Sequence, residues 1–466
     1  MNDPTAHDYD VIVIGAGGAG LAAAAVASDQ GARVLLVEAG PRAGGSTSLS
    51  GGVFYAAGTS LQREAGITDD SPDAMFQYYM TLNQFKLEAG LVRQLCDDAP
   101  VAFEWLRALG VEFRAEDLYV AGVDKLRRGH RAAGQGAAIA EALEGVISQQ
   151  HVDVAYATRV EKLLIEQGRV SGIIVDGEPV RAAATVIATG GFGANPEMLA
   201  RLYPDAARHG DWHWYIGQPS CRGDGLVMGQ SAGGELSAPN RGLLLLTPGF
   251  AKDLEVYLPG WLMVVNQQGR RFVDESIEYS VLAGVLGEQS GRRCYGLFDE
   301  ASRLAAKLSP VRPAPHWTAD RLAELADRGD LVRADSLESL AAQLDVPLAA
   351  LETSVARYNQ HAEAARDEDF FKSSAMLRPV RQPPFYAATV RAAIICWTGT
   401  GLRIDRAARV LDAAGCAVLG LFAAGETTGG MFGECYAAGG ASIANAIVFG
   451  RIAGREAAKL AGVTKI

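Results

Sequence analysis

The sequence has few cysteines, and none of them stands in a metal-binding pattern. The six cysteines are scattered along the chain, from Cys96 to Cys435, without a C-x-x-C or C-x-x-C-H motif. This spacing gives no support for a zinc site, an iron–sulfur cluster or a c-type haem. We therefore expect no metal, and we interpret the cysteines as buried, reduced thiols of a cytoplasmic protein.

Long apolar runs and an excess of positive charge are also absent. No stretch of about 18 uncharged apolar residues occurs, which predicts no membrane span. The polar and acidic N-terminal segment 1–10 predicts no signal peptide. The formal net charge of −11 argues against nucleic acid or an anionic membrane surface as a partner. With 466 residues, 49% of them hydrophobic, the chain can bury a large core, and we expect two domains.

A glycine-rich stretch near the N-terminus is the strongest local signal. Residues 11–14, VIVI, predict a buried parallel strand, and Gly15, Gly17 and Gly20 follow in G-x-G-x-x-G spacing before an alanine-rich helix. A second predicted strand ends at Glu38. The glycines allow a tight turn, close approach to a pyrophosphate and close helix–strand packing, and the acid can accept from a ribose hydroxyl. The stretch therefore predicts a dinucleotide-binding βαβ unit.

Two later segments also match a nucleotide site. The loop 41–52, PRAGGSTSLSGG, is too rich in glycine and serine to predict a helix, and its backbone and hydroxyls can bind a cofactor. A buried strand over 186–188 runs directly into the Thr-Gly-Gly of 189–191. This second strand end indicates another close approach of backbone to a nucleotide.

The C-terminal part repeats the same pattern. A strand over 421–424 runs into Gly425 and Glu426, and residues 441–460 predict a helix that begins after glycines. The N–H groups and the positive end of that helix point toward whatever lies beside them. Nucleotide-type strand ends at both ends of one chain favour a single long cofactor, FAD rather than NAD.

The predicted fold class is α/β, with an inserted α+β domain. Residues 1–237 and 398–466 are the two parts of a Rossmann-like FAD-binding domain, and 238–397 are a cap or substrate domain with charged helices. Within the first part, apolar spacing predicts helices over 71–110, with Pro100 at the start of the second one.

These motifs resemble those of the FAD-dependent fumarate reductase and succinate dehydrogenase flavoprotein superfamily. The resemblance covers essentially the whole chain and rests on DVIVIGAGGAGLAAA, VEAGPRAGGST, VIATGGFGAN, NQQGRRFVDES and GLFAAGETTGG. It implies a glutathione reductase-like FAD-binding domain with an inserted cap, and hydride exchange between the flavin and a substrate carbon. Succinate dehydrogenases carry a histidine for covalent flavin where Ser46 and Thr47 stand here, which implies non-covalent FAD.

The candidate cofactor-binding residues lie in the glycine-rich turns and at the strand ends. Two of them belong to the GDG motif over 223–225, which the resemblance includes. The candidates are Gly15, Gly17, Gly18, Ala19, Gly20, Glu38, Ala39, Gly44, Gly45, Ser46, Thr47, Gly51, Gly52, Thr189, Gly190, Gly191, Asn195, Gly223, Asp224, Gly425, Glu426, Gly439, Ala441, Ser442 and Ile443.

The cationic groups of a fumarate reductase site are missing from this sequence. Tyr279 stands where those enzymes use an arginine acid, and Trp397 stands where they have a histidine. Tyr436 lies near the position of their carboxylate-binding arginine. The resemblance to fumarate reductases therefore does not imply their dicarboxylate chemistry.

The replacements resemble the 3-ketosteroid dehydrogenases of the same superfamily. The segment DESIEY places Tyr279 on the tyrosine of their RFxNESxxY motif, and YAAGGAS places Tyr436 and Gly440 on the tyrosine and last glycine of YPGPGAT. The resemblance implies that Tyr279 takes a proton from the carbon next to a ketone, while Tyr436 and the Gly440 N–H hold the ketone oxygen. Such a pair of donors stabilises a developing enolate. The prolines of YPGPG are absent here.

The expected substrate is a small neutral cyclic ketone, such as a 3-ketosteroid or a cyclohexanone, which the enzyme desaturates at the α,β position. An apolar pocket suits such a molecule. The candidate pocket residues are Tyr119, which is also a counterpart of an assisting tyrosine, and the apolar walls Trp261, Trp397, Met431 and Phe432.

Two other functions stay open. A carboxylic acid oxidoreductase, such as a tricarballylate dehydrogenase or a fumarate reductase, would need cations from Arg131, Arg241 or Arg391. A non-catalytic flavin-binding protein would bind flavin without turnover. His130 and Arg131 precede a helix, and a structural or solvated role is the simpler interpretation of both. The sequence does not name the electron acceptor.

Overall fold

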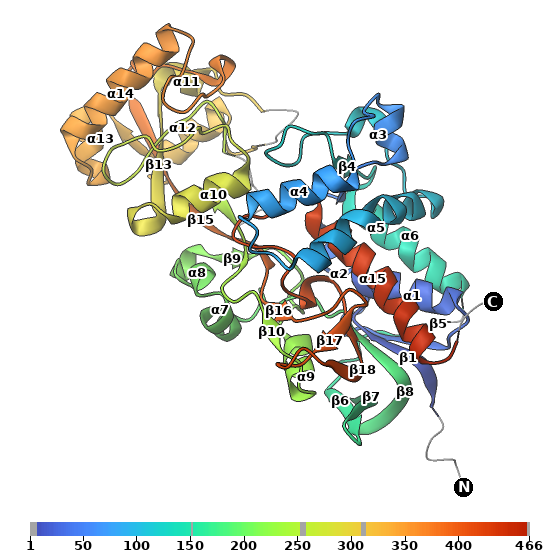
Figure 1. Cartoon of the computed structure of the whole chain (residues 1–466). Helices are drawn as coiled ribbons and strands as arrows, with labels where there is room; N and C mark the ends of the chain where they lie inside the picture. Colours follow the sequence, from blue (N-terminus) through green and yellow to red (C-terminus); the bar gives the residue numbers. More distant parts are fainter. Residues whose placement is uncertain (1–6, 151, 252–257, 309–313, 464–466) are drawn as a thin grey trace. The chain divides into compact units, whose positions relative to one another are not determined.

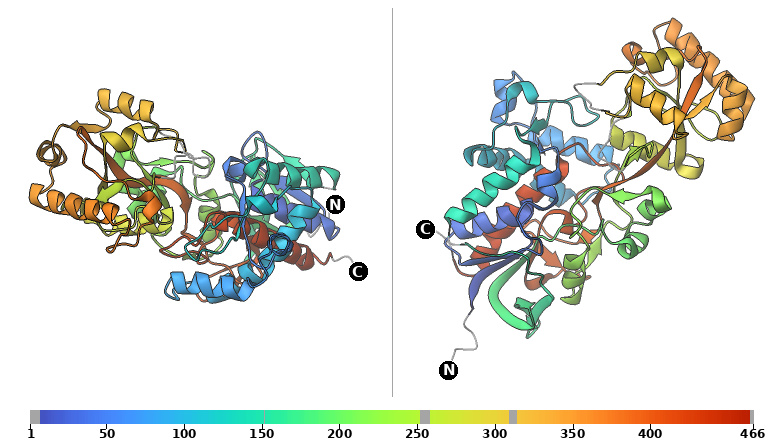
Figure 2. Two further views of the ribbon diagram at one scale, coloured as in Figure 1. Left: turned by 90° about the horizontal axis from the view of Figure 1, so that it is seen from above. Right: turned by 180° about the vertical axis from the view of Figure 1, so that it is seen from behind.

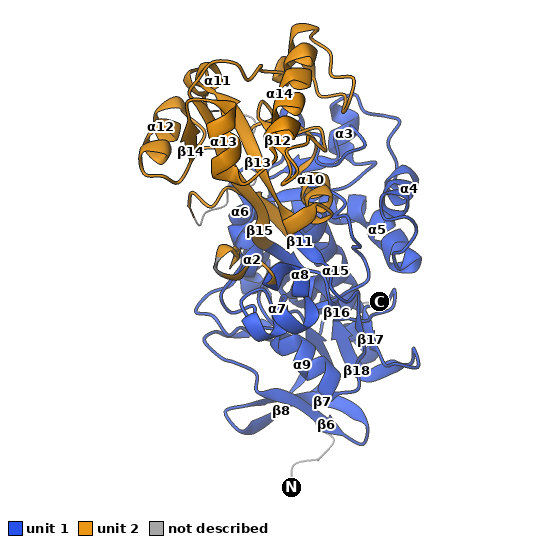
Figure 3. Ribbon diagram, turned by 90° about the vertical axis from the view of Figure 1, so that its left-hand side faces the viewer, with its two compact units in different colours: residues 1–207, 217–243, 396–466 blue, residues 208–216, 244–395 orange. Residues whose placement is uncertain are grey.

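The computed structural model of the chain describes residues 7–150, 152–251, 258–308 and 314–463. The segment 1–6, which belongs to the stretch that predicts no signal peptide, lies outside these ranges. Two compact units divide the chain, as Figure 3 shows in two colours. Unit 1 comprises residues 1–207, 217–243 and 396–466, and unit 2 comprises residues 208–216 and 244–395.

An eight-stranded sheet forms the centre of unit 1. Its main path has the order β17 (Arg409–Leu411), β18 (Ala417–Ala423), β8 (Glu178–Ile187), β1 (Tyr9–Ile14), β2 (Val34–Val37) and β5 (Val152–Ala155). From β18 to β5 all neighbours are parallel, and the helix α1 makes the crossover from β1 to β2. The meander β6 (Lys162–Glu166) and β7 (Arg169–Val175) pairs with β8. The predicted α/β class and parallel βαβ unit are confirmed.

Two helices at opposite ends of the chain lie side by side in unit 1. They are α1 (Gly18–Asp29) and α15 (Ala441–Leu460), drawn in blue and red in Figures 1 and 2. A Cβ on Gly450 or Gly454 would come within 2.4 Å or 2.2 Å of a backbone oxygen of α1. The helices therefore touch backbone to backbone, and this contact holds the N-terminus of α15 beside the first βαβ unit.

The helix α5 corrects one prediction from the sequence. Pro100 does not start a helix, because α5 (Ala89–Ala108) runs through it. An interior proline costs about 3 kcal/mol. Burial of an apolar stripe on both sides of the proline opposes that cost, with Leu95, Cys96, Ala99, Ala102, Phe103 and Leu106 all buried.

The remaining elements of unit 1 are short, apart from two helices. The longer helices are α4 (Pro72–Leu82) and α6 (Gln135–Gln149). The others are α2 (Gly45–Leu49), β3 (Val53–Tyr55), α3 (Ser60–Glu64), β4 (Gly129–Arg131), α7 (Pro196–Leu202), α8 (Pro204–Ala207), α9 (Asp224–Ser231), β10 (Leu236–Ser237) and β16 (Gly401–Leu402). None of the helices in the described ranges is long and apolar enough to cross a membrane.

Unit 2 is built on a mixed sheet of six strands. The strands are β9 (Trp214–Tyr215), β11 (Gly242–Thr247), β12 (Met263–Val265), β13 (Arg293–Asp299), β14 (Val332–Ala334) and β15 (Phe385–Thr398), and the ends of β11 and β15 belong to unit 1. Its helices are α10 (Tyr279–Gly287), α11 (Glu300–Leu304), α12 (Ala319–Asp327), α13 (Leu337–Leu344) and α14 (Leu348–Glu363). Asp345, in the left-handed conformation at the end of α13, separates α13 from α14.

Candidate active site

The turn after β1 has the shape of a pyrophosphate-binding turn. Gly15 has a φ of +101°, which favours glycine. A Cβ on Gly20 would lie 1.8 Å from the carbonyl oxygen of Gly15, so α1 begins in contact with the turn. The Glu38 carboxylate, at the end of β2, accepts hydrogen bonds from the Ala16 N–H at 2.7 Å and the Gly40 N–H at 2.6 Å. This places the predicted ribose-binding acid beside the predicted phosphate-binding turn.

The segment after Gly44 corrects a second prediction. Residues 45–49 form the short helix α2, although their composition does not favour a helix. The Thr47 hydroxyl accepts a hydrogen bond from the Gly18 N–H at 3.2 Å, and the Ser50 hydroxyl donates to the Thr47 carbonyl at 2.7 Å. The hydrogen bond between Gly18 and Thr47 joins the start of α1 to α2. The composition of the segment does not predict such a contact, because the two residues are far apart in the sequence.

The ends of β8, β15 and β18 meet at one place in unit 1. The Glu426 carboxylate accepts hydrogen bonds from the N–H and the hydroxyl of Thr398, at 2.9 and 2.8 Å. A Cβ on Gly191 would lie 2.0 Å from that hydroxyl and 2.3 Å from the carboxylate. The Thr427 hydroxyl donates to the Gly190 carbonyl at 3.0 Å. Burial raises the pKa of Glu426 to about 7, although the two hydrogen bonds from Thr398 lower it.

Thr398 is not among the residues that the sequence motifs indicate. It lies in the run TGTG over 398–401, where a threonine follows an apolar strand and precedes a glycine. Thr189 also follows an apolar strand and precedes a glycine, so the same pattern could have identified Thr398. The contact with Glu426 itself joins residues 28 positions apart, and only the fold shows it.

Three predicted cofactor residues have other contacts in the structure. The Asn195 side chain caps α7 by accepting from the Met198 N–H at 3.2 Å. Asp224 pairs with Arg159 at the start of α9. The Ser46 hydroxyl accepts a hydrogen bond from the Gln218 N–H at 3.1 Å. Asn195 and Asp224 therefore have local structural partners, and their roles toward the cofactor stay predictions.

The N-terminus of α15 brings together most of the predicted substrate residues of unit 1. Gly440 is the residue before the helix and has a φ of +93°. The Tyr436 hydroxyl accepts a hydrogen bond from the Ser442 N–H, in the first turn, at 2.8 Å. The ring of Phe432 lies 5.3 Å from that of Tyr436 and 4.9 Å from that of Trp397, measured between ring centres. The indole N–H of Trp397 is buried and has no hydrogen-bond partner among the described residues.

The electrostatics of Tyr436 fit a hydrogen-bond donor. Burial raises the pKa of its hydroxyl above the ordinary value, and the hydrogen bond from Ser442 only partly opposes this. The phenol therefore stays protonated at neutral pH. A hydroxyl that accepts from an N–H keeps its own proton for donation to another acceptor.

The other predicted substrate residues belong to other elements of the chain. Tyr279 is the first residue of α10 in unit 2, where the Glu278 carboxylate caps the helix by accepting from the Ser280 N–H at 2.7 Å. Trp261 packs inside unit 2, with its ring centre 5.5 Å from that of Phe298. Tyr119 lies in unit 1, and the centre of its ring is 5.0 Å from the Cζ atom of Arg131.

The arginines that an acid substrate would need are engaged by other groups. Arg131 lies over the Tyr119 ring, and Arg391 lies 4.1 Å from the ring centre of Trp212. Arg241 donates to the Glu434 carboxylate at 3.1 Å, beside a cavity of about 230 Å³ in unit 1. Of these three arginines, Arg241 is paired with a carboxylate, and the other two lie against aromatic rings.

His130 has the contacts of a structural residue. It is fully buried, its Nε2 lies 2.8 Å from the Thr59 hydroxyl, and its Nδ1 lies 2.8 Å from the Arg128 carbonyl. Burial lowers its pKa to about 4 against the effect of the backbone carbonyls. The imidazole is therefore neutral at pH 7.

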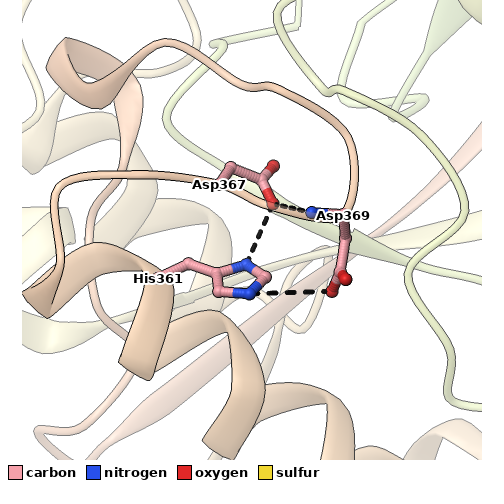
Figure 4. Close-up of side chains that lie close together, drawn as sticks. All are labelled: His361, Asp367 and Asp369. Carbon is pink, nitrogen blue, oxygen red and sulfur yellow. Dashed lines mark hydrogen bonds and ion pairs between the residues drawn. The ribbon is translucent and has the colours of Figure 1, made fainter.

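One group of side chains in unit 2 has the composition of a metal site. His361, Asp367 and Asp369 lie together in Figure 4, and His361 Nδ1 is 2.9 Å from Asp367. Each carboxylate already pairs with an arginine, Asp367 with Arg271 at 2.9 Å and Asp369 with Arg357. The group therefore belongs to an ion-pair network, and the expectation of no metal stays a prediction.

The fold and the glycine-rich strand ends together define a flavin-binding enzyme of the dinucleotide-binding class. The chain matches the FAD binding domain family over residues 10–443 and belongs to this family. It is 34% identical to the fumarate reductase (cytochrome) of Shewanella frigidimarina, over 97% of this chain and 78% of that protein. It is 26% identical to the 4-oxocyclohexanecarboxylate 2-dehydrogenase of Sinomonas cyclohexanicum, over 97% of this chain and 93% of that protein.

A solved structure extends the similarity to the ketosteroid dehydrogenases. The 3-ketosteroid-Δ4-(5α)-dehydrogenase of Rhodococcus jostii RHA1, in complex with 4-androstene-3,17-dione, superposes with a TM-score of 0.81 at 27% identity. The match covers 98% of this chain and 99% of that one. The predicted resemblance and the FAD cofactor are confirmed, and the protein is an FAD-dependent oxidoreductase. The open space at Gly17, where the nearest atom to an added Cβ would be the Gly45 Cα at 3.9 Å, fits the close approach of that cofactor to the turn.

Proposed function

We propose that this protein desaturates a neutral cyclic ketone at the α,β position. The observation that carries the proposal is the aromatic surroundings of Tyr436 at the N-terminus of α15, formed by Trp397 and Phe432. A protonated phenol and a helix N-terminus are donors suited to a neutral carbonyl oxygen. The similarity to a ketosteroid dehydrogenase and to an oxocyclohexanecarboxylate dehydrogenase supports a ketone substrate.

The proposed mechanism separates a proton from a hydride. FAD, when bound, supplies the acceptor of the hydride from the β carbon. Tyr279, the first residue of α10, takes the α proton. The Tyr436 hydroxyl and the Gly440 N–H donate to the ketone oxygen as negative charge develops on it. A tyrosine has an ordinary pKa of about 10, so a tyrosine base needs a neighbouring group that stabilises its phenolate.

Two further features belong to the proposal. Unit 2, which carries Tyr279, acts as the cap or substrate domain. The FAD is held without a covalent bond, because Ser46 and Thr47 stand where a linking histidine would be. Acid precipitation of the purified protein should release all flavin absorbance into the supernatant, and flavin that stays with the pellet would contradict this point.

A carboxylic acid oxidoreductase is the second candidate, because the fumarate reductase of Shewanella frigidimarina is 34% identical. That function would need free cations at the substrate. The engagement of Arg131 and Arg241 within unit 1 counts against it.

Anaerobic bleaching of the flavin absorbance tests the two candidates together. The purified holoenzyme is mixed with saturated cyclic ketones, from cyclohexanones to 3-ketosteroids, and separately with succinate and tricarballylate. We expect bleaching by a ketone and recovery of the matching enone. Bleaching by an acid alone would overturn the ketone proposal in favour of the second candidate.

A further inference from the structure

The segment that carries Phe432 and Tyr436 has no regular secondary structure of its own. Residues 431–440, all of them described, contain no helix or strand and connect the region after β18 to α15. The position of the Tyr436 ring therefore depends on contacts from other parts of unit 1. The closest of these contacts come from α4 and from the turn that follows it.

Asn83, at the C-terminal end of α4, holds the residue directly before Tyr436. Its side-chain amide donates to the Cys435 carbonyl at 3.0 Å, and its amide oxygen accepts from the Cys435 N–H at 3.1 Å. The side chain is buried, with a residue exposure of 4%. Both main-chain groups of Cys435 are thereby paired by one side chain, as in a strand pair.

Two neighbouring contacts complete this arrangement. A Cβ on Gly433 would lie 2.4 Å from the Asn83 amide oxygen, so the glycine provides the room that Asn83 needs. Tyr78, also on α4, donates from its hydroxyl to the Ala437 carbonyl at 2.5 Å. The backbone is thus held on both sides of Tyr436 by the same helix.

We infer that Asn83 is a positioning residue, which fixes the Tyr436 hydroxyl at the N-terminus of α15 by pairing the backbone of Cys435. This inference rests on the proposed role of Tyr436 as a donor to the ketone oxygen. A side-chain amide offers one donor and one acceptor side by side, whereas an ionised carboxylate offers acceptors alone. An aspartate at position 83 would place an oxygen against the Cys435 carbonyl, and the pair would open.

Unit 2 contains a matched control for this change. The Asn359 amide donates to the Val380 carbonyl at 2.9 Å and accepts from the Val380 N–H at 2.7 Å. Asn359→Asp therefore makes the same chemical change in the same kind of pair, in a unit that does not contain Tyr436.

Hydrogen exchange of the holoenzyme tests the positioning without any substrate. We expect Asn83→Asp to speed exchange in peptides covering 431–440 by about tenfold or more. Asn359→Asp should speed exchange only around Val380. Unchanged exchange over 431–440 in Asn83→Asp would overturn the inference.

Kinetics in two backgrounds test the consequence for catalysis. Asn83→Asp should slow flavin reduction at saturating ketone by about 10-fold to 100-fold, with KM changed less, because a misplaced donor costs rate. In a Tyr436→Phe background the same change should slow reduction by less than about twofold, since the group it positions is gone. Equal losses in both backgrounds would mean a general structural role and would overturn the inference.

An unfolded Asn83→Asp variant and a wild type that no ketone reduces each have a separate test. If Asn83→Asp does not yield a folded holoenzyme, Gly433→Ala opens the same contact while keeping the amide, and the same two tests apply. If the wild type is reduced by no ketone, the proposed function is wrong, whereas the exchange test still decides whether Asn83 holds the segment. The kinetic cycle is then run with whichever acid reduces the flavin.

Discussion

The strand ends of unit 1 and the interior of unit 2 are held together by different forces. At the strand ends, backbone lies against backbone, so that a Cβ on Gly20 would meet a carbonyl oxygen at 1.8 Å. In unit 2, by contrast, charged side chains meet in the interior. Arg271 pairs with Glu275 and Asp367, both at 2.9 Å, and all three side chains are at most 6% exposed.

The difference follows from what each region has to bind. A nucleotide site must leave backbone N–H groups open to phosphate, so it tolerates little side-chain volume. The buried charges of unit 2 are paired with one another and with backbone N–H groups, and burial alone would favour neutral Asp367. The hydrogen bond and the charge of Arg271 outweigh burial and hold the pKa of Asp367 below its ordinary value. Steric changes should therefore damage the first region most, and charge changes the second.

Arg271→Met should have the largest effect and break the ion-pair network of unit 2. It leaves Glu275 and Asp367 buried without their main partner, which typically costs about 3–5 kcal/mol. Urea unfolding, followed by hydrogen exchange of unit 2 peptides, measures the loss. Arg357→Met is the control, because Arg357 is 57% exposed and its pair with Asp369 should contribute at most about 1 kcal/mol. Equal losses in both variants would contradict the comparison.

Gly20→Ala should break the steric packing at the strand ends of unit 1. The new methyl group overlaps the Gly15 carbonyl, and we expect a loss of about 3 kcal/mol together with most of the bound FAD. Flavin content and thermal unfolding measure both. Gly145→Ala on α6 is the control, because nothing lies within 4 Å of its Cβ. That variant should gain about 0.5–1 kcal/mol from helix propensity.

Acidification should change the stability of the two units through different groups and in different pH ranges. His130 in unit 1 has a folded pKa of about 4, lower than the unfolded value of about 6.5, so its contribution is full above 6.5 and is lost as the pH falls toward 4. The shift corresponds to about 3 kcal/mol. Asp367 in unit 2 also has a lowered pKa, and its contribution is lost only below about pH 3.9. Glu426, also in unit 1, has a raised pKa of about 7 and therefore adds stability as the pH falls, so the His130 effect is measured as a difference between variants. As the pH falls from 7 to 4, urea unfolding should show His130→Gln gaining stability relative to the wild type.

Tyr436→Phe should have the smallest effect on folding and a clear effect on turnover. Removing one donor to a developing oxyanion costs about 100-fold in rate, or about 2.7 kcal/mol in the barrier. Flavin content should stay normal, which separates this change from Gly20→Ala. Stopped-flow reduction by the best ketone measures it, and near-normal turnover would refute the assigned donor role.

The local signals in the sequence were reliable where one stretch of chain carries the whole interaction. The strand, turn and helix from Val11 to Glu38 were predicted because steric limits on the turn act within a few residues. Pro100 misled because its local cost is outweighed by apolar burial along α5, which depends on what the helix packs against.

The candidate site divides in the same way. Tyr436 and Gly440 could be identified from motif spacing, because they are four residues apart in one segment. The sequence around Asn83 does not indicate a role in the site, because a single asparagine at the end of a helix is common and usually only ends that helix. Its role depends on Cys435, which lies 352 residues away.

The amino-acid sequence by itself determined the flavin-binding class and the parallel βαβ unit. These follow from which residues have side chains small enough, or of the right charge, for a given position. Only the tertiary structure decided that α2 is a helix, that Thr398 bonds Glu426 and that α4 holds the backbone around Tyr436. Those features depend on burial and hydrogen bonding between distant segments, and such energies exist only once the chain has folded.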